Sequence, residues 1–122
     1  MEQQITKEVT RKVLTTKFNY SMPTEELKVI MPSVAPKFSD IPGCCWKIWL
    51  TNEDRNESGG VYLFESGKEL EQFLKSALFA SVIKNPAFCN LQTHTFDVME
   101  AASLITGAPL NPVNIHLKRN EQ

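Results

Sequence analysis

The sequence lacks the features that mark several common classes of protein. Its charge is nearly balanced, with 13 Lys and Arg residues against 14 Asp and Glu residues and a formal net charge of -1. No global field therefore draws the chain to nucleic acid or to anionic membranes. No apolar run approaches the roughly 20 residues that span a membrane, and the first residues lack the layout of a signal peptide. We expect a cytoplasmic protein that binds neither nucleic acid nor membranes.

Cysteines and catalytic motifs are also scarce. The three cysteines, Cys44, Cys45 and Cys89, are odd in number and have no CxxC spacing, which argues against a disulfide framework or a zinc site. The chain has no Ser-His-Asp order, no P-loop and no Rossmann glycine pattern, so the usual hydrolase, nucleotide and nicotinamide classes are excluded. From these patterns we expect no zinc site and no nucleotide or nicotinamide cofactor.

The length and composition that remain are those of a single globular domain. The chain has 122 residues, of which 42% are hydrophobic and 22% charged, and a second core has almost no room in such a length. Residues 1–10 are polar and unpatterned, so we expect an N-terminal arm there. We place the folded domain at residues 11–105 and an irregular C-terminal tail at residues 106–122.

Four segments have the alternation or the β-prone composition of strands: 11–20, 44–51, 61–64 and 88–99. One face of the first strand consists of Leu14, Thr16, Phe18 and Tyr20. One face of the second is wholly apolar and is expected to point toward the helices: Cys44, Trp46, Ile48 and Leu50. The polar stretch 52–58 and the pair Gly59 and Gly60 are expected to reverse the chain between the second and third strands, which then form a hairpin.

Two helices are expected between these strands. Thr24 can serve as the N-cap of the first helix. Pro32 inside that helix removes a hydrogen bond at a cost of about 3 kcal/mol, so we expect a kink or a restart near Met31 and an end before Pro36. The second helix is expected to be one continuous amphipathic helix over residues 68–84.

The resulting order of elements predicts an α+β domain of the ferredoxin-like βαββαβ kind. Both helices then cover one face of an antiparallel sheet. The other face, with Cys45, Trp49 and Thr51 on it, is too apolar to be left in water. A second copy of the sheet can cover it, so we expect a homodimer.

Three sequence blocks carry a resemblance to a known family: residues 42–49 (Pro-Gly-Cys-Cys-Trp-Lys-Ile-Trp), 59–64 (Gly-Gly-Val-Tyr-Leu-Phe) and 95–98 (Thr-Phe-Asp-Val). From about Leu14 to Leu104 the chain resembles the YdhR-like monooxygenases, which belong to the dimeric α/β-barrel superfamily with the antibiotic-biosynthesis monooxygenases. The resemblance implies that fold. It also implies a pocket between sheet and helices in which an aromatic substrate is oxygenated without metal or flavin.

The resemblance also implies particular site residues. Trp46 and Tyr62 match the family blocks directly. Superfamily relatives often have a Trp-Glu pair at the position of Phe64 and Glu65 in this chain. Phe64 is therefore expected to line the pocket. Thr16 lies near the position of a first-strand Asn in some relatives.

Oxygenation without a cofactor requires the substrate to supply the electrons as a phenolate-like carbanion, so the protein need only bind, deprotonate and exclude water. Aromatic rings suit the binding of a flat substrate, and a Tyr hydroxyl or a His can hold the proton or the developing oxyanion. The expected catalytic residues are Trp46, Tyr62 and His94. The expected substrate-binding residues are Thr16, Phe18, Tyr20, Ile48 and Phe64. We expect a small aromatic or polyketide-like substrate in an apolar pocket.

Two other functions fit the sequence. Aromatic strand residues usually pack in a core, and a lone His is more often structural than catalytic. If none of these residues is catalytic, the domain can be a dimer that only binds a small apolar ligand. Residues 54–65 also fit the spacing of an EF-hand calcium loop, with oxygen ligands from Asp54 to Glu65 and Gly59 at position six. That loop must join two helices, however, and its flanks alternate like strands.

Overall fold

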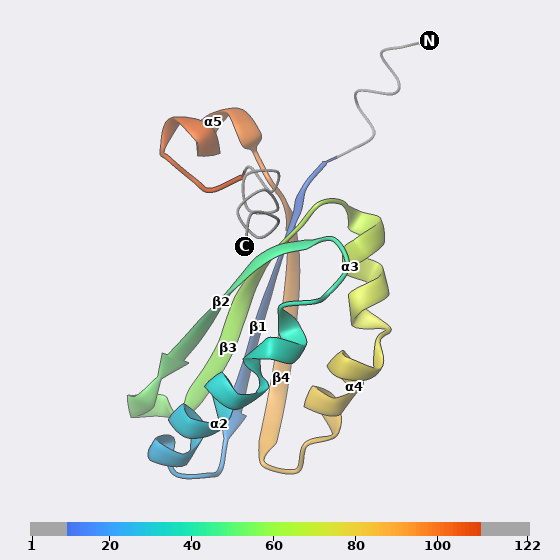
Figure 1. The fold of residues 1–122 in the computed structure, drawn as a ribbon. Helices are drawn as coiled ribbons and strands as arrows, with labels where there is room; N and C mark the ends of the chain where they lie inside the picture. The colour runs from blue at the N-terminus through green and yellow to red at the C-terminus, as the bar shows by residue number, and fades with distance from the viewer. Residues whose placement is uncertain (1–9, 111–122) are drawn as a thin grey trace, which may run out of the picture.

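The computed structural model of the protein describes residues 10–110 (Figure 1). The elements in order are β1 (Lys12–Tyr20), α2 (Thr24–Phe38), β2 (Cys44–Asn52), the 3-10 turn η1 (Glu53–Arg55), β3 (Glu57–Phe64), α3 (Gly67–Leu74), α4 (Ala77–Lys84), β4 (Phe88–Asp97) and α5 (Glu100–Ile105). The predicted arm and tail lie outside the described residues, apart from residue 10 and residues 106–110.

The four strands form one antiparallel sheet in the order β2-β3-β1-β4. Helices α2, α3 and α4 cover one face of it, and α5 lies at one end (Figure 1). This arrangement confirms the predicted ferredoxin-like α+β fold. Within residues 10–110, no helix has the length and apolar character needed to cross a membrane.

The main core lies between the sheet and the three helices. Its buried members are Leu14, Phe38, Ile41, Tyr62, Phe64, Leu70, Phe73 and Phe79. Full burial of a Leu or Phe side chain stabilises a fold by about 1.5–3 kcal/mol, so this cluster holds the helices on the sheet. The inward face predicted for β1 is confirmed, because Leu14, Thr16, Phe18 and Tyr20 are all buried.

The predicted face of β2 is wrong beyond its first residue, because β2 contains a bulge. Cys44 pairs with Phe64 and Trp46 pairs with Leu63, so Cys45 is an extra residue between them. One extra residue reverses the alternation of every later side chain. Cys44 faces the helices as predicted, but Trp46 packs on the opposite face of the sheet.

The predicted hairpin of β2 and β3 is present, with its turn at η1 inside the polar stretch 52–58. The part assigned to Gly59 and Gly60 is wrong, because both glycines lie inside β3. A Cβ atom on Gly59 would lie 2.0 Å from the carbonyl oxygen of Thr16, and one on Gly60 would lie 2.7 Å from Cε of Lys47. The two glycines therefore permit close approach of neighbouring groups within the sheet.

Helix α2 continues through both of its prolines to Phe38, so its predicted end before Pro36 is wrong. Pro32 and Pro36 are one turn apart and both exposed. The carbonyl groups that lose their helical partner belong to residues four positions earlier, Lys28 and Pro32, which lie on the same exposed side. Water can satisfy these carbonyls, which lowers the cost of each proline.

The predicted second helix is in fact two helices, α3 and α4, separated at Lys75 and Ser76. The hydroxyl oxygen of Ser76 accepts a hydrogen bond from the backbone N–H of Phe79 at 3.2 Å, and the hydroxyl donates to the carbonyl of Phe73 at 2.6 Å. Ser76 is therefore a local N-cap that competes with a continuous helix. The break turns α4 so that Phe79 enters the core.

The segment after α5 folds back over the face of the sheet that the helices leave uncovered. Leu110 is buried there against Cys45 and Leu63. The indole N–H of Trp46 donates a hydrogen bond to the carbonyl oxygen of Pro109 at 2.8 Å. Part of the open face is thus covered by the chain itself.

Candidate functional site

A cavity of about 140 Å³ lies between the sheet and helices α2 and α4. The sheet contributes Thr16, Phe18, Lys47, Trp49 and Tyr62 to its wall, and the helices contribute Val34, Phe38, Phe79 and Val82. Most of this wall is apolar or aromatic. Such a wall, with a few polar groups directed into it, is typical of sites for small molecules.

Lys47 is the most unusual group in this wall. Its ammonium nitrogen lies 3.4 Å from the centre of the Trp49 ring, 3.9 Å from that of Phe38 and 4.6 Å from that of Tyr62. Its aliphatic stem passes over Gly60, where the missing side chain leaves room for it. Burial lowers the pKa of Lys47 from 10.5 to about 7, although the nearby Cys44 opposes this change. Lys47 therefore loses its proton far more readily near neutral pH than an exposed lysine does.

Tyr62 lies opposite Lys47 in the β2–β3 pair. Its ring packs on Phe73, with ring centres 5.1 Å apart. Burial and the nearby Cys44 raise the pKa of Tyr62 well above its ordinary value, and a side-chain hydrogen bond with Thr16 only partly offsets this effect. Tyr62 is therefore a neutral phenol that can donate a hydrogen bond but cannot act as a base near neutral pH.

Cys44 lies beside this pair on β2 and stays a thiol. Burial, with a smaller effect from Cys45, raises the pKa of the Cys44 thiol to about 11. Its Sγ donates to the carbonyl oxygen of Trp46 at 3.4 Å. A protonated, partly buried thiol is a poor nucleophile, so it serves as packing.

Of the eight predicted site residues, three line the cavity: Thr16, Phe18 and Tyr62. Two more face the helices but lie outside its wall. Phe64 is fully buried in the core against Phe73, and the Tyr20 hydroxyl is bonded to the Thr24 side chain at 2.7 Å. The expectation that Phe64 lines the pocket is therefore not met.

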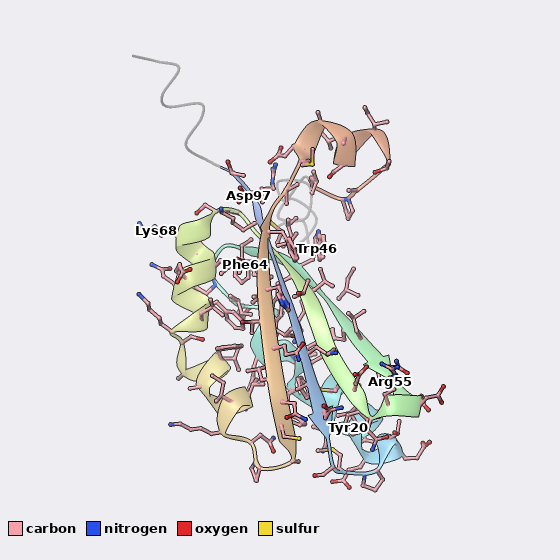
Figure 2. The ribbon with its side chains drawn as sticks, turned by 180° about the vertical axis from the view of Figure 1, so that it is seen from behind. Tyr20, Trp46, Arg55, Phe64, Lys68 and Asp97 are labelled. Carbon is pink, nitrogen blue, oxygen red and sulfur yellow. The ribbon has the colours of Figure 1, made fainter. Side chains whose placement is uncertain are left out.

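The other three predicted site residues, Trp46, Ile48 and His94, lie on the opposite face of the sheet. The Cys45 bulge places Trp46 and Ile48 there. His94 is exposed and pairs with Thr15 of β1, whose neighbour Leu14 faces the core. Figure 2 shows Phe64 on the α3 side of the sheet and Trp46 on the other side. We leave these three residues out of the site.

Sequence reasoning missed Lys47 and Trp49, which the bulge brings into the cavity. A signal was present in the Trp-Lys-Ile-Trp block, where a Lys stands between two aromatic residues. A charged residue within a strongly apolar strand is either at the surface or in a site. Strict alternation assigned it to the open face because the bulge leaves no clear trace in sequence.

The EF-hand alternative conflicts with the structure. Strand β2 precedes the turn in place of a first helix, and residues 57–64 form strand β3, which is paired with β1 and β2, so the segment is a β-hairpin and not a calcium loop. Glu57 pairs with Lys17 at 3.4 Å. Among residues 10–110, no group of three or more His, Cys, Asp or Glu side chains is placed to hold a metal ion.

Comparisons with known proteins agree with this fold. Solved structures that resemble it include a mutant of SnoaB, a cofactor-independent oxygenase from Streptomyces nogalater, with 14% identity, a TM-score of 0.59, and coverage of 74% of this chain and 94% of that one. The heme-degrader MhuD from Mycobacterium tuberculosis has 16% identity, a TM-score of 0.58, and coverage of 72% and 95%. A hydroxynitrile lyase from Passiflora edulis has 16% identity, a TM-score of 0.52, and coverage of 76% and 95%.

These likenesses establish the fold alone, because the same architecture carries different chemistries. No curated protein matches the chain. The model of one protein family, described as "Putative mono-oxygenase ydhR", matches residues 13–109, which is most of the 122 residues. The chain therefore belongs to the ydhR mono-oxygenase family.

Proposed function

We propose that the protein is a cofactor-independent monooxygenase that acts on a small aromatic substrate in the cavity between the sheet and helices α2 and α4. The observation that carries this proposal is the aromatic wall of that cavity, formed by Phe18, Phe38, Trp49, Tyr62 and Phe79, in a chain of a mono-oxygenase family. SnoaB, which has the same fold, is a cofactor-independent oxygenase.

The reaction can be balanced with dioxygen and substrate alone. For a hydroquinone, one oxygen atom of O2 forms a new C–O bond on the ring and the other leaves as water, while the ring loses four electrons and becomes a hydroxyquinone. The protein's part is to orient the ring, to assist loss of the hydroxyl proton and to exclude bulk water. In this scheme Tyr62 donates a hydrogen bond to the developing oxyanion, and Thr16 and Phe18 line the site.

The volume of the cavity limits the substrate. Its 140 Å³ is close to the roughly 150 Å³ of an engineered protein cavity that binds benzene. A single six-membered ring therefore fits the cavity as it is. A fused-ring substrate would require α2 and α4 to move apart, and we accordingly propose a one-ring substrate.

Oxygen uptake with hydroquinone tests this function. We expect the wild type to consume oxygen faster than a protein-free control and to form the hydroxyquinone. Val82→Trp should abolish this activity because Val82 lines the cavity, whereas Ile83→Trp, the exposed next residue of α4, should retain it. Tyr62→Phe should lower the rate by about 10²-fold, the usual cost of removing an oxyanion donor. Equal uptake by all four proteins would reject the proposal.

The same variants separate an enzyme from a binding module. A non-catalytic module would bind an aromatic compound in the cavity, with quenching of the fluorescence of Trp49, but would consume no oxygen. Loss of quenching in Val82→Trp together with absence of uptake in the wild type would establish that alternative.

We also propose that the protein is a homodimer, formed through the sheet face opposite the helices. Three large apolar residues on this face remain exposed: Ile48 by 51%, Leu50 by 47% and Phe96 by 55%. Ile48 and Leu50 lie on β2 and Phe96 on β4, the two edge strands of the sheet, and exposed apolar side chains of this size are costly in water. We expect Ile48→Lys with Leu50→Lys to yield a monomer in light scattering, while Val29→Lys on the exposed side of α2 leaves the dimer intact. A monomeric wild type would contradict this proposal.

A further inference from the structure

Lys47 suggests which aromatic compounds enter the cavity. Four ion pairs occur among residues 10–110, and Lys47 takes part in none of them. Its nitrogen is instead surrounded by the rings of Phe38, Trp49 and Tyr62. Cation–π contacts of this kind provide about 0.5–2 kcal/mol, which is less than the cost of moving an ammonium group out of water without a carboxylate.

The titratable groups around Lys47 give it no negative partner. Cys44 on the same strand and Tyr62 on β3 are both neutral, because burial raises the pKa of each. Lys37, the charged group that α2 contributes to the cavity wall, is positive. The other polar residues of the wall carry no charge: Thr16 of β1, Ser58 of β3, Ser81 of α4 and Asn85 just after α4. As formed by the described residues, the wall of the cavity thus contains basic and uncharged polar groups among its apolar residues, and no carboxylate.

This arrangement destabilises the folded protein, and perturbed groups of this kind cluster at functional sites. It is complemented by a ligand with two properties: a flat ring that fills the aromatic part of the cavity, and an acidic oxygen that reaches the nitrogen of Lys47. A charge-assisted hydrogen bond between that oxygen and the ammonium group would supply the missing partner. Tyr62, 4.6 Å from the same nitrogen as measured to its ring centre, can donate a second hydrogen bond.

We propose that the cavity selects one-ring phenols and that Lys47 takes the proton of the phenol hydroxyl and then pairs with the phenolate. The proton passes from the hydroxyl oxygen to the Nζ of Lys47, the O–H electron pair stays on oxygen, and no oxidant is needed for this step. The inference rests on the proposed function, because it names the substrate class and the proton acceptor of the same site. Lys47 would be a catalytic residue, since it contacts the substrate.

A binding experiment with 4-nitrophenol tests this inference without any turnover. This phenol ionises near neutral pH and its phenolate is yellow, so absorbance titration gives the pKa of the bound compound. We expect the wild type to bind the phenolate and to lower the pKa of the bound phenol. Lys47→Met should weaken phenolate binding by about tenfold or more, the worth of one hydrogen bond to a charged group, and should remove the pKa shift.

Two controls keep the result specific. 4-Nitrotoluene has the same ring and no acidic hydroxyl, so its affinity should be the same for the wild type and Lys47→Met, which also shows that the variant is folded. Lys68→Met, at an exposed Lys of α3 on the outside of the molecule (Figure 2), should bind phenolate as the wild type does. Equal phenolate binding by wild type and Lys47→Met, binding of the neutral phenol, or no binding of either probe by the wild type would each overturn the inference.

The outcome is separable from that of the proposed function. Phenolate binding that depends on Lys47, with no oxygen uptake from hydroquinone, would reject the monooxygenase and keep the selectivity for phenols. Oxygen uptake at the wild-type rate by Lys47→Met would reject the role of Lys47 and keep the monooxygenase.

Discussion

The burial of Lys47 makes the free energy of unfolding rise as the pH increases above neutrality. The pKa of Lys47 is about 7 in the folded protein, against 10.5 for the free side chain. Between these two pH values the unfolded chain binds more protons than the folded one, so the free energy of unfolding rises with pH. At about 1.4 kcal/mol per pKa unit, the burial of Lys47 costs about 4 kcal/mol at pH 7 and about 2 kcal/mol at pH 9.

The wild type should therefore gain about 2 kcal/mol of stability between pH 7 and pH 9. Urea unfolding at a series of pH values measures this gain directly, because the midpoint follows stability when the slope is constant. Lys47→Met keeps most of the side-chain volume and removes the charge. Its stability should be nearly constant over this range, and at pH 7 it should exceed that of the wild type.

The upper limit of the pH range matters, because two thiols act in the opposite direction. Burial raises the pKa of Cys44 and of Cys45 from 9.0 to about 11. A group whose pKa is raised on folding stabilises the protein fully below its unfolded value and loses that effect as pH rises through its folded value. The increase in the free energy of unfolding that is due to Lys47 is therefore best measured below pH 9, before the thiols contribute. A wild-type stability that is flat from pH 7 to pH 9, or a slope shared by Lys47→Met, would refute the reasoning.

Three further substitutions probe the core, the helix break and the returning segment. Phe64→Ala removes a fully buried ring from its contact with Phe73 and should cost about 3–5 kcal/mol in urea unfolding; a loss below about 1 kcal/mol would contradict this packing. Ser76→Ala removes the N-cap of α4 and should cost about 1 kcal/mol, while wild-type stability would show that the cap is unimportant. Trp46→Phe removes the hydrogen bond to the Pro109 carbonyl, worth about 1 kcal/mol, and should speed amide exchange at Ala108 and Leu110; unchanged exchange would show that other contacts hold this segment on the sheet.

The regular parts of the fold could be predicted from sequence because local pattern and tertiary structure agree there. Leu14 and its alternating partners on β1 are a clear case, since that strand keeps its alternation on the buried side. The helix break at Ser76 was missed because the apolar stripe runs through it, and a single hydroxyl cap decides between one helix and two. Such a decision depends on which arrangement lets Phe79 reach the core, and this is not a local property.

The candidate site was harder to predict than the fold, for a physical reason. Thr16 and Tyr62 were found because they lie on strands whose alternation holds across the cavity. Lys47 and Trp49 were assigned to the wrong face because one residue, Cys45, is inserted ahead of them. A bulge needs only one extra residue, and its position is determined by the pairing with a neighbouring strand. The periodicity of a single strand therefore cannot locate it.

The bulge at Cys45 gives this scaffold an economical way to change its specificity. If β2 instead paired with β3 without the bulge, Cys45 would lie opposite Leu63 and Trp46 opposite Tyr62, so that Trp46 and Ile48 would face the cavity while Lys47 and Trp49 would point to the other side of the sheet. The cavity would lose the amine of Lys47 without any amino-acid exchange at its wall. A change in strand register is therefore a route, besides point substitution, by which chains of this architecture can acquire new ligands.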